Sequence, residues 1–152
     1  MTEARIDSTP PMAPGALVLG WAGVVPFLVL ALAGFSPEWR AQAMSAFLPY
    51  SVAILSFLGG VRWGRALAAG AGAWQYARAV VPSLWAWAAW CLLSLEPALV
   101  ALAAGFVLAG AWDARGDALP APTAFRRLRL GLGLAVVACH ALALVALVVG
   151  PG

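Results

Sequence analysis

Charge is what this sequence has least of. Only 10 % of its 152 residues are charged, and all nine basic residues are arginine because lysine is absent. Soluble globular domains carry about 25 % charged residues, and a soluble fold of this size could not cover its surface with so few. Hydrophobic residues make up 64 %. The composition therefore excludes a water-soluble domain and predicts an integral membrane protein.

Groups that carry out chemistry are also scarce. The two cysteines, Cys91 and Cys139, have no CxxC spacing, so neither a zinc site nor a redox motif is indicated. The single histidine, His140, excludes haem ligation by two histidines of one chain. No apolar run contains a carboxylate pair, no nucleophile is spaced for a histidine, and there is no phosphate-binding loop. We therefore expect a protein that is not an enzyme and has no metal or cofactor.

Long apolar runs, by contrast, are abundant. A membrane helix needs about 20 apolar residues to cross a hydrocarbon core of about 30 Å. The candidates are residues 15–34, 41–61, 79–95, 97–112 and 130–150. The third and fourth are separated only by Glu96 and Pro97, and a proline beside a charge indicates a tight hairpin. We predict an all-α bundle of five transmembrane helices, one domain over residues 15–150, after a disordered N-terminus of residues 1–14.

The arginines predict the orientation of this bundle. With five crossings, one side of the membrane holds Arg5, Arg62, Arg65, Arg78, Arg115, Arg126, Arg127 and Arg129, and the other side holds Arg40 alone. Positive charge stays in the cytoplasm, so the N-terminus is expected inside and the C-terminus outside. Arginine without lysine, in an alanine-rich chain, is typical of GC-rich bacterial genomes, and we expect a multi-pass protein of the bacterial inner membrane.

A signal peptide is the competing interpretation of the first apolar run, because residues 31–34 resemble a cleavage site. The preceding segment contains Glu3 and Asp7 as well as Arg5, and the apolar stretch is longer than a signal peptide needs. We therefore expect the first span to be retained.

Small residues line one face of the second predicted span. Ser56, Gly60, Gly64 and Ala68 follow one another at four-residue spacing. Helices in a membrane associate where small residues allow the backbones to approach closely. This face is therefore predicted to be a helix-packing surface.

Six of the cytoplasmic arginines are candidates for contact with anionic lipid or with a partner. They are Arg62, Arg65, Arg78, Arg126, Arg127 and Arg129. Basic residues near an anionic membrane surface each contribute about 1 kcal/mol of attraction, so the net charge of +3 indicates lipid contact rather than nucleic-acid binding. Asp113 lies on the same side, where it could pair with Arg62, Arg65 or Arg129.

His140 lies at the middle of the last span, and an ionisable group at that depth is a candidate functional site. The alternative is a neutral imidazole that bonds to a carbonyl or a serine of another helix. Trp87 and Trp90 are three residues apart on one helix face and could stack on a quinone or a pigment, although packing or interface anchoring is commoner. We treat these three residues as a possible intramembrane polar or aromatic site.

Several short motifs resemble a known family. They are Gly20, Gly23, Pro26 and Phe27 in the first span, Tyr50 with ILSFLGG at 54–60, Trp63-Gly64, residues 82–85 with Trp87, Asp113, and Pro122, Arg126, Leu128 and Arg129. In this order the chain resembles the domain of unknown function 3429 family, which includes transmembrane protein 69. The resemblance spans roughly residues 15–148 and implies a small polytopic protein with no assigned reaction.

Two classes of function remain open at this point. The first is a non-enzymatic accessory or assembly subunit of a larger membrane complex, associated with other membrane subunits or with copies of itself. The second is a small transporter or a lipid- or quinone-binding protein, which is favoured by Pro26 and Pro49 within spans, by His140 and by the tryptophans. The compact set of spans and the lack of a catalytic arrangement favour the first.

Overall fold

The computed structural model describes residues 14–114 and 123–149, which form six helices and no strand. They are α1 (Pro14–Ala22), α2 (Val25–Ala33), α3 (Arg40–Ala68), α4 (Ala73–Leu92), α5 (Leu95–Ala114) and α6 (Thr123–Val149). Residues 1–13 of the predicted N-terminal segment lie outside the described part, as does Arg115, while Pro14 already belongs to α1. The predicted all-α fold is confirmed.

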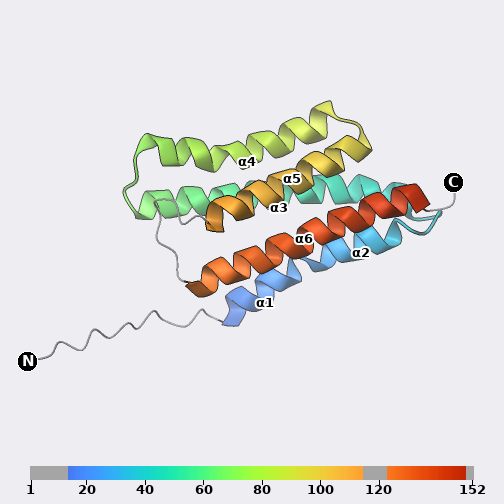
Figure 1. Cartoon of the computed structure of the whole chain (residues 1–152), viewed down its shortest axis with the longest axis horizontal. Coiled ribbons are helices and arrows are strands. Elements are labelled where there is room, and N and C mark those ends of the chain that lie inside the picture. Colours follow the sequence, from blue (N-terminus) through green and yellow to red (C-terminus); the bar gives the residue numbers. More distant parts are fainter. Residues whose placement is uncertain (1–13, 115–122, 150–152) are drawn as a thin grey trace, which may run out of the picture.

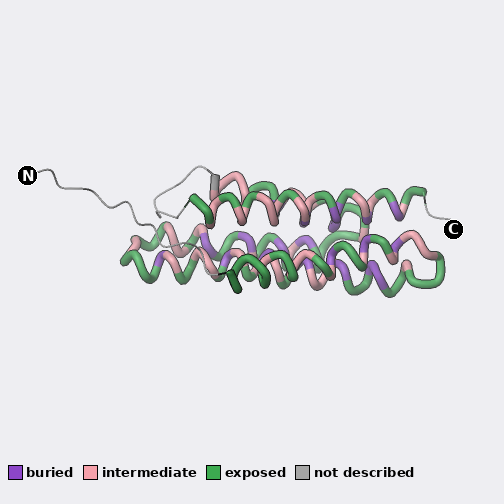
Figure 2. Tube along the Cα trace, turned by 90° about the horizontal axis from the view of Figure 1, so that it is seen from below, coloured by how far each residue is buried: buried purple, intermediate pink, exposed green. Residues whose placement is uncertain are grey.

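The helices form an elongated bundle in which successive rods run in opposite directions (Figure 1). α3 packs against α2, α4 and α5, and α6 packs against α1, α2 and α5. α4 lies at one edge of the bundle, in contact with α3 and α5. Along the helices the buried positions face the neighbouring helices, and the exposed positions lie on the outside of the bundle (Figure 2).

Four segments of the described chain are long and apolar enough to cross a membrane: Pro14–Ala33, Arg40–Ala68, Leu95–Asp113 and Thr123–Val149. Charged residues bound the apolar part of these rods. Arg40 and Arg62 on α3 are 22 residues apart, or about 33 Å along a helix, and Glu96 and Asp113 on α5 are 17 apart, or about 26 Å. Both lengths match a hydrocarbon core of about 30 Å.

The helices extend past the charged residues that bound the predicted membrane spans. α3 continues seven residues beyond the predicted end at 61, and α6 begins seven residues before the predicted start at 130. α4 begins six residues early and includes Arg78. A charge ends the part of a helix that suits lipid, but it does not end the hydrogen-bonded backbone, so the predicted bounds are too short at these ends.

The hairpin between the third and fourth runs is present, but its turn lies earlier than predicted. α4 ends at Leu92 and α5 begins at Leu95, so Glu96 and Pro97 belong to the first turn of α5. Proline is tolerated there because the first N–H groups of a helix have no partner within it. An acidic residue in the first turn also favours the positive end of the helix dipole.

The first span is not continuous. α1 ends at Ala22 and α2 begins at Val25, with Gly23 and Val24 in the turn between them. Pro26 has no N–H to donate to the carbonyl four residues before it, which explains a break at this point. The Tyr50 hydroxyl of α3 donates a 2.9 Å hydrogen bond to the Gly23 carbonyl. Pro49, by contrast, lies within the continuous helix α3.

Candidate functional site

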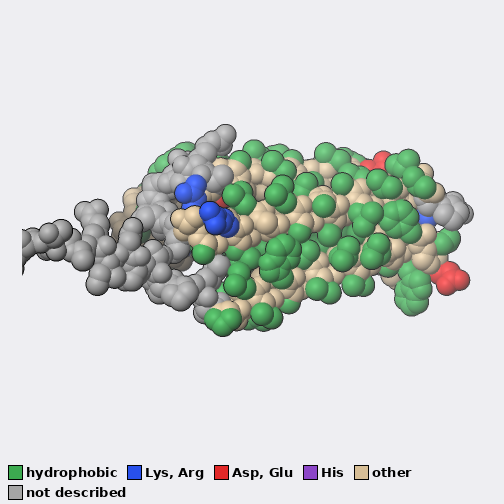
Figure 3. Space-filling view, turned by 60° about the horizontal axis from the view of Figure 1, so that its bottom comes forward, with side chains coloured by type: hydrophobic (Ala, Val, Ile, Leu, Met, Phe, Trp, Pro, Cys, Tyr) green, Lys and Arg blue, Asp and Glu red, His purple; other side chains and the backbone are tan. Residues whose placement is uncertain are grey.

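Charged side chains gather at the two ends of the bundle, with apolar side chains between them (Figure 3). The end where α3 and α5 finish and α4 and α6 begin contains Arg62, Arg65, Arg78, Asp113, Arg126, Arg127 and Arg129. We call it the arginine-rich end. The opposite end contains Glu38, Arg40 and Glu96. The described arginines therefore divide between the ends as the sequence predicted, six to one.

Asp113 joins two helices at the arginine-rich end. Its Oδ1 accepts hydrogen bonds from Nε and Nη2 of Arg62, at 3.2 and 2.9 Å, and its Oδ2 lies 2.7 Å from Nη2 of Arg129. Arg62 also donates to the Ala109 carbonyl. The side chains of Arg62, Asp113 and Arg129 are 11, 9 and 8 % exposed. This carboxylate therefore ties α5 to α3 and to α6 in a largely buried pair of ion pairs.

Two aromatic rings extend this arrangement to four arginines. The guanidinium carbons of Arg62 and Arg78 lie 5.2 and 5.1 Å from the ring centroid of Trp112. Those of Arg65 and Arg129 lie 5.6 and 5.7 Å from the ring centroid of Phe125.

We call these seven residues the arginine cluster: Arg62, Arg65, Arg78, Trp112, Asp113, Phe125 and Arg129. Four cations and one carboxylate leave a net charge of +3 on it. Such a surface attracts anions, and the planar guanidinium groups match the geometry of phosphate.

The other two predicted lipid contacts lie beside this cluster. Arg126 is half-buried and Arg127 is exposed, and both lie in the first turns of α6. Both precede the apolar run at 130–150 but belong to the helix, because α6 begins at Thr123. Cations are unfavourable at the positive end of a helix dipole, and Asp113 offsets this for Arg129.

His140 and Ser51 form the one buried polar pair among the described side chains. Nδ1 of His140 is 2.9 Å from the Val136 carbonyl, which can only accept, so Nδ1 carries the hydrogen. Nε2 is 3.2 Å from the Ser51 hydroxyl. In the neutral imidazole Nε2 is an acceptor, and the single hydrogen of the Ser51 hydroxyl is shared between it and the Phe47 carbonyl, 2.8 Å from the hydroxyl oxygen. The predicted alternative of a neutral histidine bonded to a serine of another helix describes this geometry.

Three phenyl rings enclose the imidazole. The ring centroids of Phe27, Phe47 and Phe106 lie 5.7, 4.8 and 5.5 Å from that of His140, and they belong to α2, α3 and α5. Trp87 and Trp90 lie on the exposed surface of α4 instead. The structure therefore does not combine His140, Trp87 and Trp90 into one site.

The small-residue face of α3 is not packed within the chain. A Cβ atom added at Gly60 or Gly64 would meet nothing within 4 Å. At Gly59 a Cβ atom would lie 2.5 Å from the Ala79 carbonyl oxygen of α4, so Gly59 is where α3 and α4 approach closely.

Gly60 and Gly64 therefore contact no other helix of this chain, and the packing of Ser56, Gly60, Gly64 and Ala68 against a helix of a partner stays a prediction. The buried stripe of α3 is Phe47, Ser51, Leu55 and Gly59. It differs in register by one residue, or about 100° around the helix.

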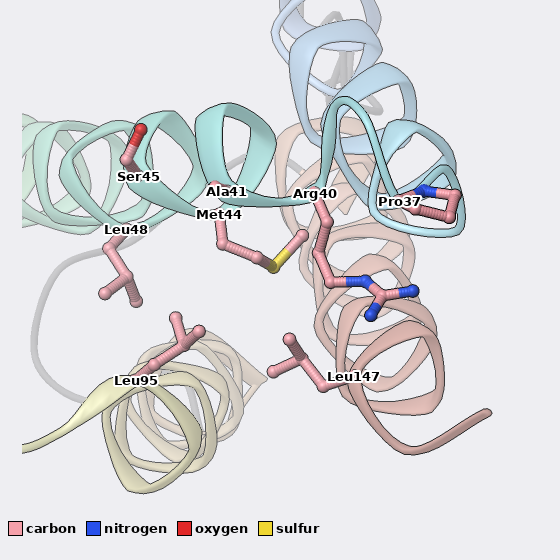
Figure 4. A pocket seen from close by; sticks show the side chains of 8 residues that line it. All are labelled: Pro37, Arg40, Ala41, Met44, Ser45, Leu48, Leu95 and Leu147. Atoms are coloured by element: carbon pink, nitrogen blue, oxygen red, sulfur yellow. The ribbon is translucent and has the colours of Figure 1, made fainter. Parts of the chain in front are cut away.

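A hollow of about 480 Å³ lies at the opposite end of the bundle, lined by Pro37, Arg40, Ala41, Met44, Ser45, Leu48, Leu95 and Leu147. Leu48, Leu95 and Leu147 extend into it from three helices, and Arg40 lies at its edge beside α6 (Figure 4). Nε of Arg40 donates a 3.0 Å hydrogen bond to the Gly34 carbonyl. This arginine therefore holds the connection between α2 and α3, and the hollow itself is apolar.

A smaller cavity of about 160 Å³ lies beside the break in the first span. Its lining residues are Leu19, Gly20, Gly23, Val24, Ile54, Phe57, Leu58, Phe106, Arg129, Leu132, Gly133 and Val136. Arg129 is the only charged residue among them. The cavity therefore joins the arginine cluster to the interior of the bundle. Among the described residues no group of three histidine, cysteine or acidic side chains could hold a metal ion.

A family model covers most of the chain, from residue 12 to residue 145, and it describes proteins of unknown function (DUF3429). The chain belongs to this family. None of the curated proteins and none of the solved structures compared with the chain matches it.

Several residues of these sites were not predicted from the sequence. Phe47 and Phe106 are apolar residues in apolar runs, so nothing in the sequence distinguishes them from other core residues, and Phe27 was noted only as part of the family motif. Trp112 and Phe125 flank the predicted charges, and their position beside Asp113 and Arg126 was the available signal. The pairing of Asp113 was predicted, and the structure assigns it to Arg62 and Arg129.

Proposed function

We propose that this protein is a non-enzymatic accessory or assembly subunit of a larger complex in the bacterial inner membrane. All five rods of the bundle cross the membrane, with the N-terminus in the cytoplasm and the C-terminus outside. The cytoplasmic arginine-rich end contacts anionic lipid headgroups. The partner is another membrane protein subunit or a second copy of this chain.

The surface of α4 carries this proposal. α4 is 20 residues long, yet it is not among the four segments that are apolar enough to cross a membrane by composition. Trp87 is nine residues beyond Arg78, or about 14 Å along the helix, which is near the middle of a hydrocarbon core of about 30 Å. Trp87 and Trp90 are 57 and 47 % exposed. Tryptophan prefers the membrane interface to its centre, so a protein partner suits this face better than lipid.

The arrangement of charge supports the orientation and the lipid contact. Six described arginines lie at one end and one lies at the other, and positive charge marks the cytoplasmic side. The arginine cluster keeps a net positive charge after its ion pairs are counted. The inner leaflet of a bacterial membrane supplies anionic headgroups at this depth.

A small transporter or a lipid- or quinone-binding protein is the alternative, and the broken first span favours it. Discontinuous helices commonly border substrate sites in transporters, and a cavity lies beside the break at Gly23. Against transport, no two halves of a chain with five rods can be equivalent repeats. The alternative function therefore requires that the cavity beside Gly23 bind a ligand.

Native purification in mild detergent tests the proposal. We expect a stoichiometric membrane partner to elute with the wild type and to be lost from a Trp87→Leu, Trp90→Leu variant. Trp21→Leu is the matched control, because Trp21 is also exposed but belongs to α1. A chain that elutes alone in all three forms would refute the accessory role, and bound quinone in that lone form would establish the alternative.

A further inference from the structure

The cavity beside the break in the first span extends inward from the arginine cluster. Arg129 lies at one end and Val136 at the other. These two residues of α6 are seven apart, which is about 10 Å along the helix. The cavity is therefore a slot parallel to the helices, with its charged end at the membrane surface.

Three glycines line this slot: Gly20, Gly23 and Gly133. A Cβ atom at Gly20 would lie 3.2 Å from Cδ1 of Leu132, and one at Gly23 would lie 3.2 Å from the Gly20 carbonyl oxygen. A Cβ atom at Gly133 would meet nothing within 4 Å. Of the three glycines, Gly133 is therefore the one where an added side chain would enter open space.

The slot opens sideways to the lipid. Leu19 on α1 and Phe57 on α3 are 74 and 65 % exposed, and both belong to its lining. An apolar cavity of about 150 Å³ takes up a molecule the size of benzene. At 160 Å³ the slot therefore has room for about six carbon atoms of a hydrocarbon chain.

The inner end of the slot offers no polar group to a ligand. Val136 and Phe106 line it there, and behind them lies His140, whose two ring nitrogens are engaged by the Val136 carbonyl and by Ser51. A ligand that reached this end with a polar ring would find no hydrogen-bond partner. The inner end therefore fits an apolar chain, and polar recognition is confined to Arg129.

We infer that the slot holds an acyl chain of an anionic phospholipid whose phosphate lies at Arg129. The positive charge of the arginine cluster selects the headgroup, and the glycine-lined slot holds part of one chain between α1, α3 and α6. This inference rests on the proposed contact of the arginines with anionic lipid. Beyond that contact, it assigns the phosphate of the lipid to Arg129 and one acyl chain to the slot.

Native mass spectrometry of the full chain tests this inference. The probes are phosphatidylglycerol and phosphatidylcholine with identical acyl chains. We expect the wild type to retain phosphatidylglycerol at least threefold more often than phosphatidylcholine. Gly133→Leu, which fills the slot, should lose this preference. Gly60→Leu is the matched control, because its added side chain also meets nothing within 4 Å but lies outside the slot.

Two further comparisons separate the headgroup from the chain. Arg129→Gln should lower the preference for phosphatidylglycerol, and glycerol phosphate, which has no chain, should not displace the bound lipid. If Gly133→Leu does not fold, Gly133→Ala and Gly133→Val replace it and should give a graded loss. Equal retention by the wild type and the Gly133 variants would overturn the slot while leaving a surface contact. Equal retention of the two lipids by the wild type would refute both.

Discussion

The Tyr50 hydroxyl donates a hydrogen bond of 2.9 Å to the carbonyl oxygen of Gly23, 27 residues earlier in the chain. Gly23 lies where α1 ends and α2 has not begun, so its carbonyl would otherwise face an apolar interior. Unsatisfied backbone groups are costly in a membrane because no water can replace the missing partner. This bond therefore stabilises the break and fixes α3 against it. The Tyr50 ring also packs on Phe27, with centroids 4.7 Å apart.

Replacing Tyr50 by phenylalanine should destabilise the bundle by about 1 kcal/mol. The ring would keep its contact with Phe27, so the loss would measure the hydrogen bond. Thermal unfolding in detergent is the measurement. Tyr76→Phe is the control, because Tyr76 packs on Trp63 away from the break and should change stability by about 0.5 kcal/mol or less. Equal stability of both variants would show that the Gly23 carbonyl needs no partner.

Substitution of the adjacent glycines of α3, Gly59 and Gly60, should affect stability very differently. Gly59→Leu should cost about 3 kcal/mol or prevent folding, because its Cβ atom would lie 2.5 Å from the Ala79 carbonyl of α4. Gly60→Leu adds the same side chain one residue later, where nothing lies within 4 Å, and should leave the melting temperature of the detergent-solubilised chain unchanged. The opposite order of stabilities would restore the packing surface first predicted from the sequence.

The pair of His140 and Ser51 should show a coupling of about 0.6 to 1 kcal/mol in a double-mutant cycle. Ser51→Ala removes the donor to Nε2 and leaves the imidazole with an unsatisfied nitrogen. His140→Leu removes the ring, after which Ser51→Ala should cost less, because it then leaves no imidazole nitrogen without a donor and removes only the bond to the Phe47 carbonyl. Denaturation of the four proteins in mixed micelles gives the coupling. Additive effects would mean that the two side chains are neighbours without a bond.

Asp113→Asn should destabilise the arginine-rich end by about 3 kcal/mol, since it leaves Arg62 and Arg129 as largely buried cations without a counter-charge. Glu96→Gln removes an exposed carboxylate at the opposite end of the same helix and should change stability by about 0.5 kcal/mol or less. Limited proteolysis near residues 115–122, compared with global unfolding, would locate the effect. Similar profiles for the two variants would contradict the role of Asp113 in joining α5 to its neighbours.

Composition and charge position were sufficient to predict the helical membrane fold, because long, nearly charge-free apolar runs match the length of membrane-spanning helices. The pairing of Asp113 was also predictable from its unbalanced charge. The break at Pro26 was not, because Pro49 and Pro82 also lack a donor and lie within the continuous helices α3 and α4. Helix ends were not, because the backbone of α3 and α6 continues through the arginines into the interface.

The packing register of α3 shows why the rest could not be predicted. Gly59 and Gly60 are adjacent in the sequence, and each belongs to a series of residues spaced four apart. One series contains Leu55 and Gly59, and the other contains Ser56, Gly60 and Gly64. The series with more small residues looked like the contact face. The structure uses the other, because Ala79 and Ser83 of α4 lie opposite Gly59. In a membrane both faces are apolar, so hydrophobicity does not distinguish the buried face from the exposed one.

The number and direction of the membrane crossings depend on whether α4 crosses. If α4 crosses with the other rods, the connection between α3 and α4 is cytoplasmic and the connection between α4 and α5 is outside. In a Cys91→Ser background, a cysteine at Ser94 should react with a membrane-impermeant maleimide added to intact cells, and a cysteine at Gly72 should react only after lysis. Cys139 is buried and should not contribute. A C-terminal phosphatase fusion should be active, and a C-terminal fluorescent fusion should be dark. Labelling of both cysteines from the same side would mean that α4 does not cross, and the reverse pattern at every position would invert the proposed orientation.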